Sequence, residues 1–87
     1  MLDRISKAKL VSKIENQICE IENVEGCILV WFNTFNPSVV VFFEETLNLK
    51  EREKILNQIN KVMEEYDVSK ILEVRHGKAS FNIEYSR

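Results

Sequence analysis

The stretch from Gly26 to Glu45, GCILVWFNTFNPSVVVFFEE, holds two runs of β-favouring residues separated by a polar segment that contains the chain's one proline. Valine, isoleucine and aromatic residues favour extended backbone, whereas asparagine, proline and serine favour turns. The stretch therefore predicts a β-hairpin with strands at about 26–33 and 38–45.

A helical pattern lies on each side of this hairpin. Before it, apolar residues recur at spacings of three and four, which predicts an amphipathic helix at about 3–22. After it, a similar pattern predicts a helix at about 49–66, where Asn48 and Glu51 have the spacing of a capping box. Each helix has one apolar stripe, so we expect both to pack on a sheet.

The C-terminal residues repeat the pattern of two strands. KILEVRH at 70–76 and ASFNIEYS at 79–86 favour strands, with a tight turn at His76–Lys78 between them. The order helix, strand, strand therefore occurs twice, and the hexamers KIENQI and KILNQI mark the same place in each helix. The similarity of these hexamers could reflect an internal duplication or chance, and the sequence leaves both explanations open.

This order predicts an α+β two-layer sandwich with a four-stranded antiparallel sheet and two helices on one face. It corresponds to a ferredoxin-like plait in circularly permuted order. With the strands lettered A to D along the chain, the predicted sheet order is C-D-B-A. We expect a single domain at 1–87, made of two αββ halves at about 3–45 and 46–87.

The helix, strand, strand, helix, strand order over about residues 13–76 resembles the cytoplasmic domain of cation diffusion transporters, which dimerises. The metal-binding histidines of that domain have no counterparts here. The order is also similar to that of the lipid-associated domains of bacterial envelope proteins, although their glycine-bearing strand pattern is missing. Both resemblances are analogies of fold and carry no site residue across.

In the first hairpin the runs CILVWF and VVVFF are apolar at every position, although one face of a two-layer sheet is normally solvated. Matching the two halves places Ile28 and Val30 toward the helices, so the opposite side chains would form an apolar patch on the open face. The predicted interface consists of Cys27, Leu29, Trp31, Val40 and Phe42. Such patches usually mark interaction sites, so we expect a homodimer or a protein partner. The alternatives are that the N-terminal segment covers the patch or that the assigned facing is wrong.

A second candidate site is the turn that joins the last two strands. Arg75, His76 and Lys78 could form a small anion-binding corner. The alternative is a solvated turn whose charges keep an exposed loop in water. No spacing of histidine and cysteine predicts a metal site, and no glycine-rich motif predicts a nucleotide cofactor.

Net charge and cysteine content limit which partners and which cysteine chemistry we expect. Twelve Lys and Arg against fourteen Asp and Glu give a net charge of −2, which disfavours nucleic acid as a partner. A weaker alternative is nucleic-acid or membrane binding by a basic strip on the first helix, formed by Arg4, Lys7, Lys9 and Lys13. Cys19 and Cys27 are expected to be free thiols that serve in packing.

The sequence favours a cytoplasmic protein. We expect no signal peptide and no transmembrane segment, because the apolar runs are far shorter than a membrane helix. The predicted function is a non-enzymatic protein-interaction or regulatory module. The alternatives are an anion-binding sensor or minor enzyme that uses Arg75, His76 and Lys78, and a nucleic-acid binder.

Overall fold

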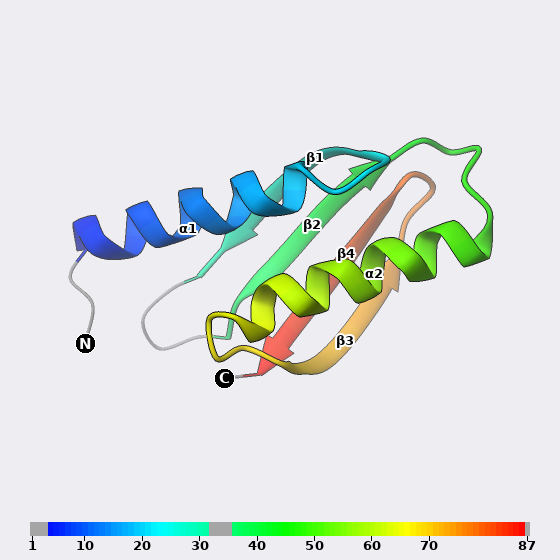
Figure 1. Cartoon of the computed structure of the whole chain (residues 1–87). Coiled ribbons are helices and arrows are strands. Elements are labelled where there is room, and N and C mark those ends of the chain that lie inside the picture. The colour runs from blue at the N-terminus through cyan, green and yellow to red at the C-terminus, as the bar shows by residue number, and fades with distance from the viewer. Residues whose placement is uncertain (1–3, 32–35, 87) are drawn as a thin grey trace.

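The computed structural model describes residues 4–31 and 36–86 of the chain, and the side chains from Lys7 onward within those ranges. The elements follow one another in the predicted order, helix, strand, strand, twice (Figure 1). They are α1 (Arg4–Cys19), β1 (Val24–Val30), β2 (Ser38–Phe43), α2 (Leu49–Glu64), β3 (Lys70–His76) and β4 (Ser80–Ser86). The predicted connection between the first two strands falls largely at 32–35, outside the described residues.

The four strands form one antiparallel sheet in the order β1-β2-β4-β3. This is the predicted order C-D-B-A, read from the other edge. Both helices lie on the same face of the sheet, α1 toward the β1 side (Figure 1). The two-layer α+β architecture is therefore confirmed, and the other face of the sheet carries no helix.

The start of α2 shows how local sequence fixes an element. Asn48 has extended backbone, and its side-chain Oδ1 accepts a hydrogen bond of 2.9 Å from the backbone N–H of Glu51. This bond satisfies one of the amide groups that a helix leaves unpaired at its first turn. From there Ile55, Ile59 and Met63 recur every four residues and are all buried.

The near-identical hexamers place equivalent residues in the core. Ile14 and Ile18 of α1 are fully buried, and the equivalent Ile55 and Ile59 of α2 are at most 2% exposed. The core between the layers is completed chiefly by Val39, Val41, Phe43, Phe81, Ile83 and Tyr85. The sheet thus supplies its inward side chains mainly from the two central strands, β2 and β4.

Polar groups at the edge of this core are paired with one another. The hydroxyl of Tyr85 donates to Oδ1 of Asn60 at 2.7 Å, and that of Tyr66 donates to Oε1 of Gln17 at 2.8 Å. The second bond joins the segment just after α2, which contains Tyr66, to Gln17 on α1. These bonds hold both helices in place without leaving a buried hydroxyl unpaired.

The predicted facing of β1 is wrong. Leu29 and Trp31 are buried, at 5% and 7% exposure, whereas Ile28 and Val30 are exposed at 51% and 43%. Cys27 is half-buried on the same side as Leu29. The predicted outward facing of Val40 and Phe42 in β2 is confirmed by burial of the residues on either side of them.

Irregular strand pairing explains the error. The prediction transferred the facing of the second hairpin to the first, which requires unbroken alternation in both. Instead β3 has a register shift between Ile71 and Glu73, and Leu72 within it is 52% exposed. A similar shift lies between Val24 and Gly26 in β1. Because a β-bulge adds a residue to one strand, it reverses the alternation beyond it.

Candidate interaction surface

An apolar patch lies on the helix-free face of the sheet, in β1 and β2. We call it the open-face patch, and it consists of Ile28, Val30, Val40 and Phe42. Ile28 lies directly opposite Val40 in the antiparallel pair, so their side chains are neighbours on one face. Val30 and Phe42, the latter 40% exposed, extend the patch along the two strands.

Gly26 makes room for the largest side chain of the patch. It lies opposite Phe42 in the strand pairing, and a Cβ added at Gly26 would lie 3.7 Å from Cδ2 of the Phe42 ring. That is ordinary van der Waals contact, so the ring extends over the glycine. Phe42 therefore lies close to the β1 backbone and forms one end of a continuous surface with Ile28.

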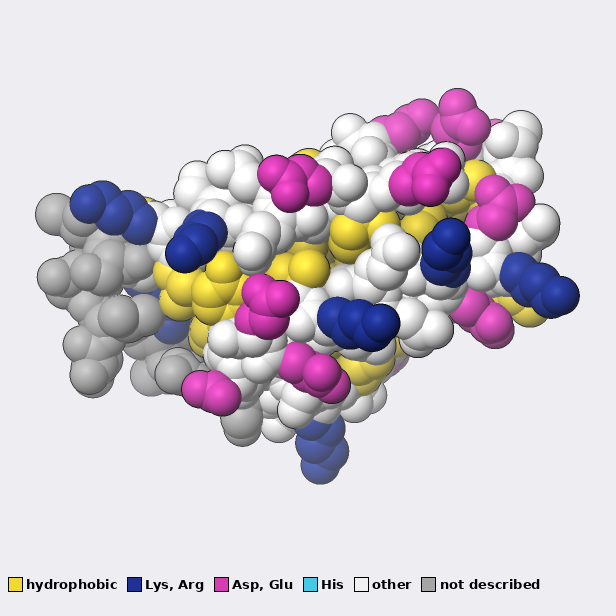
Figure 2. Space-filling model, in the orientation of Figure 1, with side chains coloured by type: hydrophobic (Ala, Val, Ile, Leu, Met, Phe, Trp, Pro, Cys, Tyr) yellow, Lys and Arg dark blue, Asp and Glu magenta, His cyan; other side chains and the backbone are white. Residues whose placement is uncertain are grey.

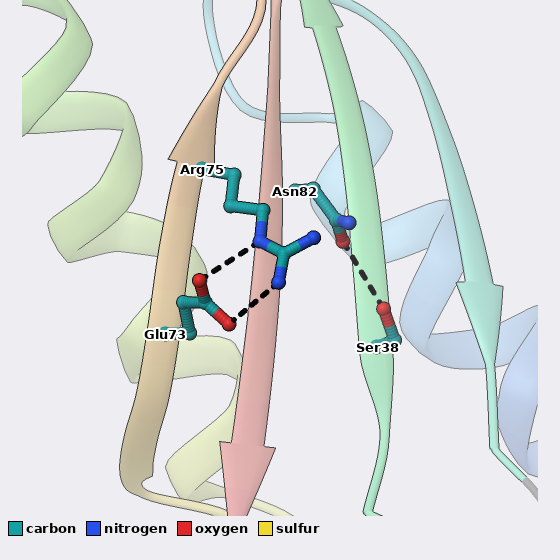
Figure 3. Close-up of polar contacts among 4 residues, drawn as sticks. All are labelled: Ser38, Glu73, Arg75 and Asn82. Atoms are coloured by element: carbon teal, nitrogen blue, oxygen red, sulfur yellow. Dashed lines mark hydrogen bonds and ion pairs between the residues drawn. The ribbon is translucent and has the colours of Figure 1, made fainter.

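Beside the patch, two pairs of polar side chains from β2, β4 and β3 are joined by hydrogen bonds on the open face (Figure 3). The hydroxyl of Ser38 donates to Oδ1 of Asn82 at 3.1 Å. Arg75 donates two hydrogen bonds to the Glu73 carboxylate, at 2.8 and 3.2 Å. The hydrogen bonds and charge of Arg75 lower the pKa of Glu73 from its usual value. Arg75 thus pairs with Glu73 beside the open-face patch, and the Glu84 carboxylate on the same face also acts on Arg75, which leaves these three residues with an excess negative charge.

Both edges of the sheet carry features that discourage pairing with another strand. At the β1 edge, the backbone N–H of Leu29 donates to Oε2 of Glu15 on α1 at 3.1 Å. At the other edge, β3 has its register shift at Leu72 and carries the charged pair Glu73 and Arg75. Occupied backbone groups, bulges and charges are the usual protection of edge strands. The open face is thus a more accessible apolar surface than the edges.

The helix side of the molecule differs from the open face. Charged side chains lie along both helices there, and a band of apolar side chains runs between them (Figure 2). Among the described residues of the helices, Leu49 is the one large hydrophobic residue that is exposed, at 68%. The partly buried helical residues pack against the core instead. The band therefore belongs mainly to the packing of the helices on the sheet.

Trp31 is a core residue and not part of the open-face patch. Its ring is covered by Lys7, whose Nζ lies 4.6 Å from the ring centroid. Lys7 itself is only 8% exposed, so it directs its ammonium over the aromatic face in a cation–π contact. This contact also removes Lys7 from the predicted basic strip, in which Lys9 and Lys13 remain exposed.

The structure does not bring Arg75, His76 and Lys78 together. Arg75 is bonded to Glu73 on the open face, whereas the His76 ring stands edge-on to Phe81, which is buried on the helix side, with centroids 5.1 Å apart. Lys78 lies 3.9 Å from a carboxylate oxygen of Glu45, in a contact that water screens because both side chains are exposed. No common anion cradle results from these three positions.

The two cysteines lie at the junction of α1 and β1. Cys19 ends α1 and is exposed, whereas Cys27 is half-buried in β1. Burial, with the nearby Cys19 and Glu15, raises the pKa of the Cys27 thiol to about 12. A thiol with such a pKa is a poor nucleophile at neutral pH, because only the thiolate attacks.

One shallow pocket lies away from the open face, between the turn after α1 and the start of α2. Its volume is about 210 Å³, and its lining is mostly polar. The lining residues are Glu22, Asn23, Glu51, Lys54, Ile55 and Gln58. No described group of three histidine, cysteine or acidic side chains converges to hold a metal ion. The pocket thus shows no arrangement that defines a reaction.

Sequence reasoning found Val40 and Phe42 but missed Ile28 and Val30. Gly26 was a usable signal, because a glycine inside a strand often marks a bulge or a close approach of another group. Allowing a bulge there would have left the facing of β1 undecided.

Comparison of the chain with models of protein families and with curated proteins finds no match. Across residues 4–31 and 36–86, neither helix combines the length and apolar character needed to cross a membrane.

Proposed function

We propose that this chain is a small non-enzymatic interaction module that associates with a second copy of itself through the open-face patch. The observation that carries the proposal is the exposure of Ile28, Val30 and Phe42 side by side on a sheet face without helices. Large apolar side chains gathered on one surface are costly to leave in water and are typical of interaction sites.

The placement of charge on the same face limits how two copies can meet. Glu73 pairs with Arg75, and Ser38 bonds to Asn82, but Glu84 adds a further carboxylate opposite Ser38 and Glu73. Two such faces would therefore meet through their apolar halves, with the charged halves kept apart. Since the patch occupies one side of the face, the β1 and β2 halves of two copies would overlap around a two-fold axis.

The association would be weak and reversible. Each of the three exposed side chains has about half of its surface left to bury, which is worth about 1 kcal/mol per side chain. Two copies would together gain about 6 kcal/mol, from which the lost freedom of the free chains must be subtracted. Because 6 kcal/mol corresponds by itself to a dissociation constant of about 40 μM, the subtraction puts the actual constant on the order of millimolar or weaker.

The test is the mass in solution, measured by light scattering without a column over a wide dilution series that starts at millimolar chain. The wild type should pass from dimer to monomer as it is diluted. Phe42→Glu and Ile28→Glu should remain monomeric, because each would place a charge in the interface. Leu49→Glu is the matched control, since Leu49 is more exposed but lies on α2.

Two outcomes would contradict the proposed dimer. The first is a wild type that stays monomeric at the highest concentration, which would direct the search to a different protein partner. The second is a dimer that Leu49→Glu disrupts and Phe42→Glu does not. Circular dichroism of each variant separates loss of the interface from loss of the fold.

Within this proposal the α-β-β-α-β-β order is interpreted as a permuted ferredoxin-like plait, used as a scaffold for a sheet face. We also propose a cytoplasmic location, in keeping with two free thiols in the structure. An anion sensor and a nucleic-acid binder gain no support from the geometry, because Arg75 is paired with Glu73 and Lys7 is buried against Trp31.

A further inference from the structure

The chain reverses direction between the two cysteines. α1 ends at Cys19, and β1 begins at Val24 after a turn in which Asn23 has a positive φ of 73°. Asparagine tolerates this left-handed conformation better than most residues. The last turn of α1 therefore runs alongside the first residues of β1, in the opposite direction.

One hydrogen bond fixes how the helix and the strand are aligned. Oε2 of Glu15 accepts from the backbone N–H of Leu29 at 3.1 Å. Cys19 lies four residues beyond Glu15, which is about 6 Å along a helix. Cys27 lies two residues before Leu29, which is about 7 Å along a strand. Both steps lead from the bond toward the turn, so they bring Cys19 alongside Cys27.

The direction of the Cys27 side chain agrees with this alignment. Cys27 pairs with Val41, which is fully buried on the helix side of the sheet. Its thiol therefore faces the layer that contains α1. In the same arrangement, Cys19 and Glu15 lie close enough to Cys27 to raise the pKa of its thiol.

We propose that Cys19 and Cys27 are a redox modification site, which small disulfides of the glutathione class oxidise to an intramolecular disulfide. The exposed Cys19 thiolate first attacks one sulfur of the small disulfide, forms a mixed disulfide and releases one small thiolate. Cys27 then loses its proton to solvent, and its thiolate attacks the neighbouring Cys19 sulfur, which releases the second small thiolate. This second step is the slow one at neutral pH, because little of the Cys27 thiol is ionised there. The two protein thiols lose two electrons, and the small disulfide gains them.

The bond would tie the end of α1 to the edge strand β1. Cys27 lies between Gly26 and Ile28, so the tie would restrain the strand that carries half of the open-face patch. It would also restrain the unfolded chain by closing a short loop. A closed loop of this size should raise the Tm on the order of 10 °C.

The experiment incubates the reduced full chain with oxidised glutathione at mildly alkaline pH, where more of the Cys27 thiol is ionised, and follows intact mass after acid quenching stops further exchange. The wild type should lose the mass of two hydrogen atoms while remaining one chain, and its Tm should rise. Cys27→Ser should stop at a mixed disulfide on Cys19. Cys19→Ser should react much more slowly than the wild type, and dithiothreitol should reverse every product.

Formation of the disulfide requires Cα atoms about 4.4–6.8 Å apart, so the experiment also tests the alignment. Three results for the wild type would overturn the proposal: a product that stops at the mixed disulfide, a disulfide that links two chains, or an unchanged mass. Dimerisation through the open face does not enter this measurement, because Phe42→Glu keeps both cysteines and should close the same disulfide.

Discussion

Alanine substitutions at two adjacent residues of β1 should have very different costs. Leu29→Ala removes a side chain that is 5% exposed, whereas Ile28→Ala removes one that is 51% exposed. Each change deletes three carbon atoms, worth about 0.8 kcal/mol apiece when they are fully buried. For Leu29 a cavity adds to this loss, so the free energy of unfolding should fall by about 2–4 kcal/mol.

For Ile28 about half of that transfer energy applies, and no enclosed cavity forms, so the expected loss is about 1 kcal/mol. Alanine lowers strand propensity more at Ile28 than at Leu29, because isoleucine is β-branched, so this effect reduces the difference slightly without reversing it. Urea unfolding followed by circular dichroism measures both values, at a concentration low enough to keep the chain monomeric. The difference should appear as a Tm lower by about 10 °C for Leu29→Ala. Equal losses, or a larger loss at Ile28, would refute the observed facing of β1.

Three further outcomes follow from individual contacts. Asn48→Ala removes the acceptor at the start of α2 and should cost about 1 kcal/mol by urea unfolding, whereas an unchanged midpoint would mean that the cap contributes nothing. Lys7→Ala uncovers the Trp31 ring, so acrylamide should quench its fluorescence more strongly than in the wild type; equal quenching would contradict the stacked arrangement. Burial raises the pKa of the Cys27 thiol from 9.0 to about 12 and also raises that of the Tyr85 hydroxyl, so the folded chain keeps protons that the unfolded chain loses. Stability from these groups is complete below about pH 9 and is lost as the pH rises toward 12. Cys27→Ala should reduce the slope of stability against pH in that window, and an unchanged slope would contradict the shift.

Element order and sheet order could be predicted because they depend on patterns that tolerate local error. The spacing of Ile55, Ile59 and Met63 marks a helix whatever its exact ends, and the run of valines before Phe42 marks a strand. Short connections and an antiparallel sheet then leave few possible arrangements. Element order and sheet order thus depend on the residue pattern of whole segments and not on the position of any single residue.

The facing of β1 could not be obtained in this way, because one extra residue in a strand reverses every side chain beyond it. Whether Ile28 or Leu29 faces the core depends on the register with β2, and CILVWF is apolar on both faces. The contacts of Glu15 with Leu29 and of Lys7 with Trp31 depend in turn on where α1 lies over the sheet edge. No spacing along the chain encodes such pairings between separate elements.

The association proposed for the open-face patch can be tested residue by residue with amide NMR spectra recorded over a dilution series. The proposal predicts that signals of Ile28, Val30, Val40 and Phe42 shift with concentration, while those of Ile55 and Ile59 in the core of α2 stay constant. The same series on Phe42→Glu should show no shifts. Concentration-dependent shifts confined to the helices, or none in any part of the wild-type chain, would contradict the proposal.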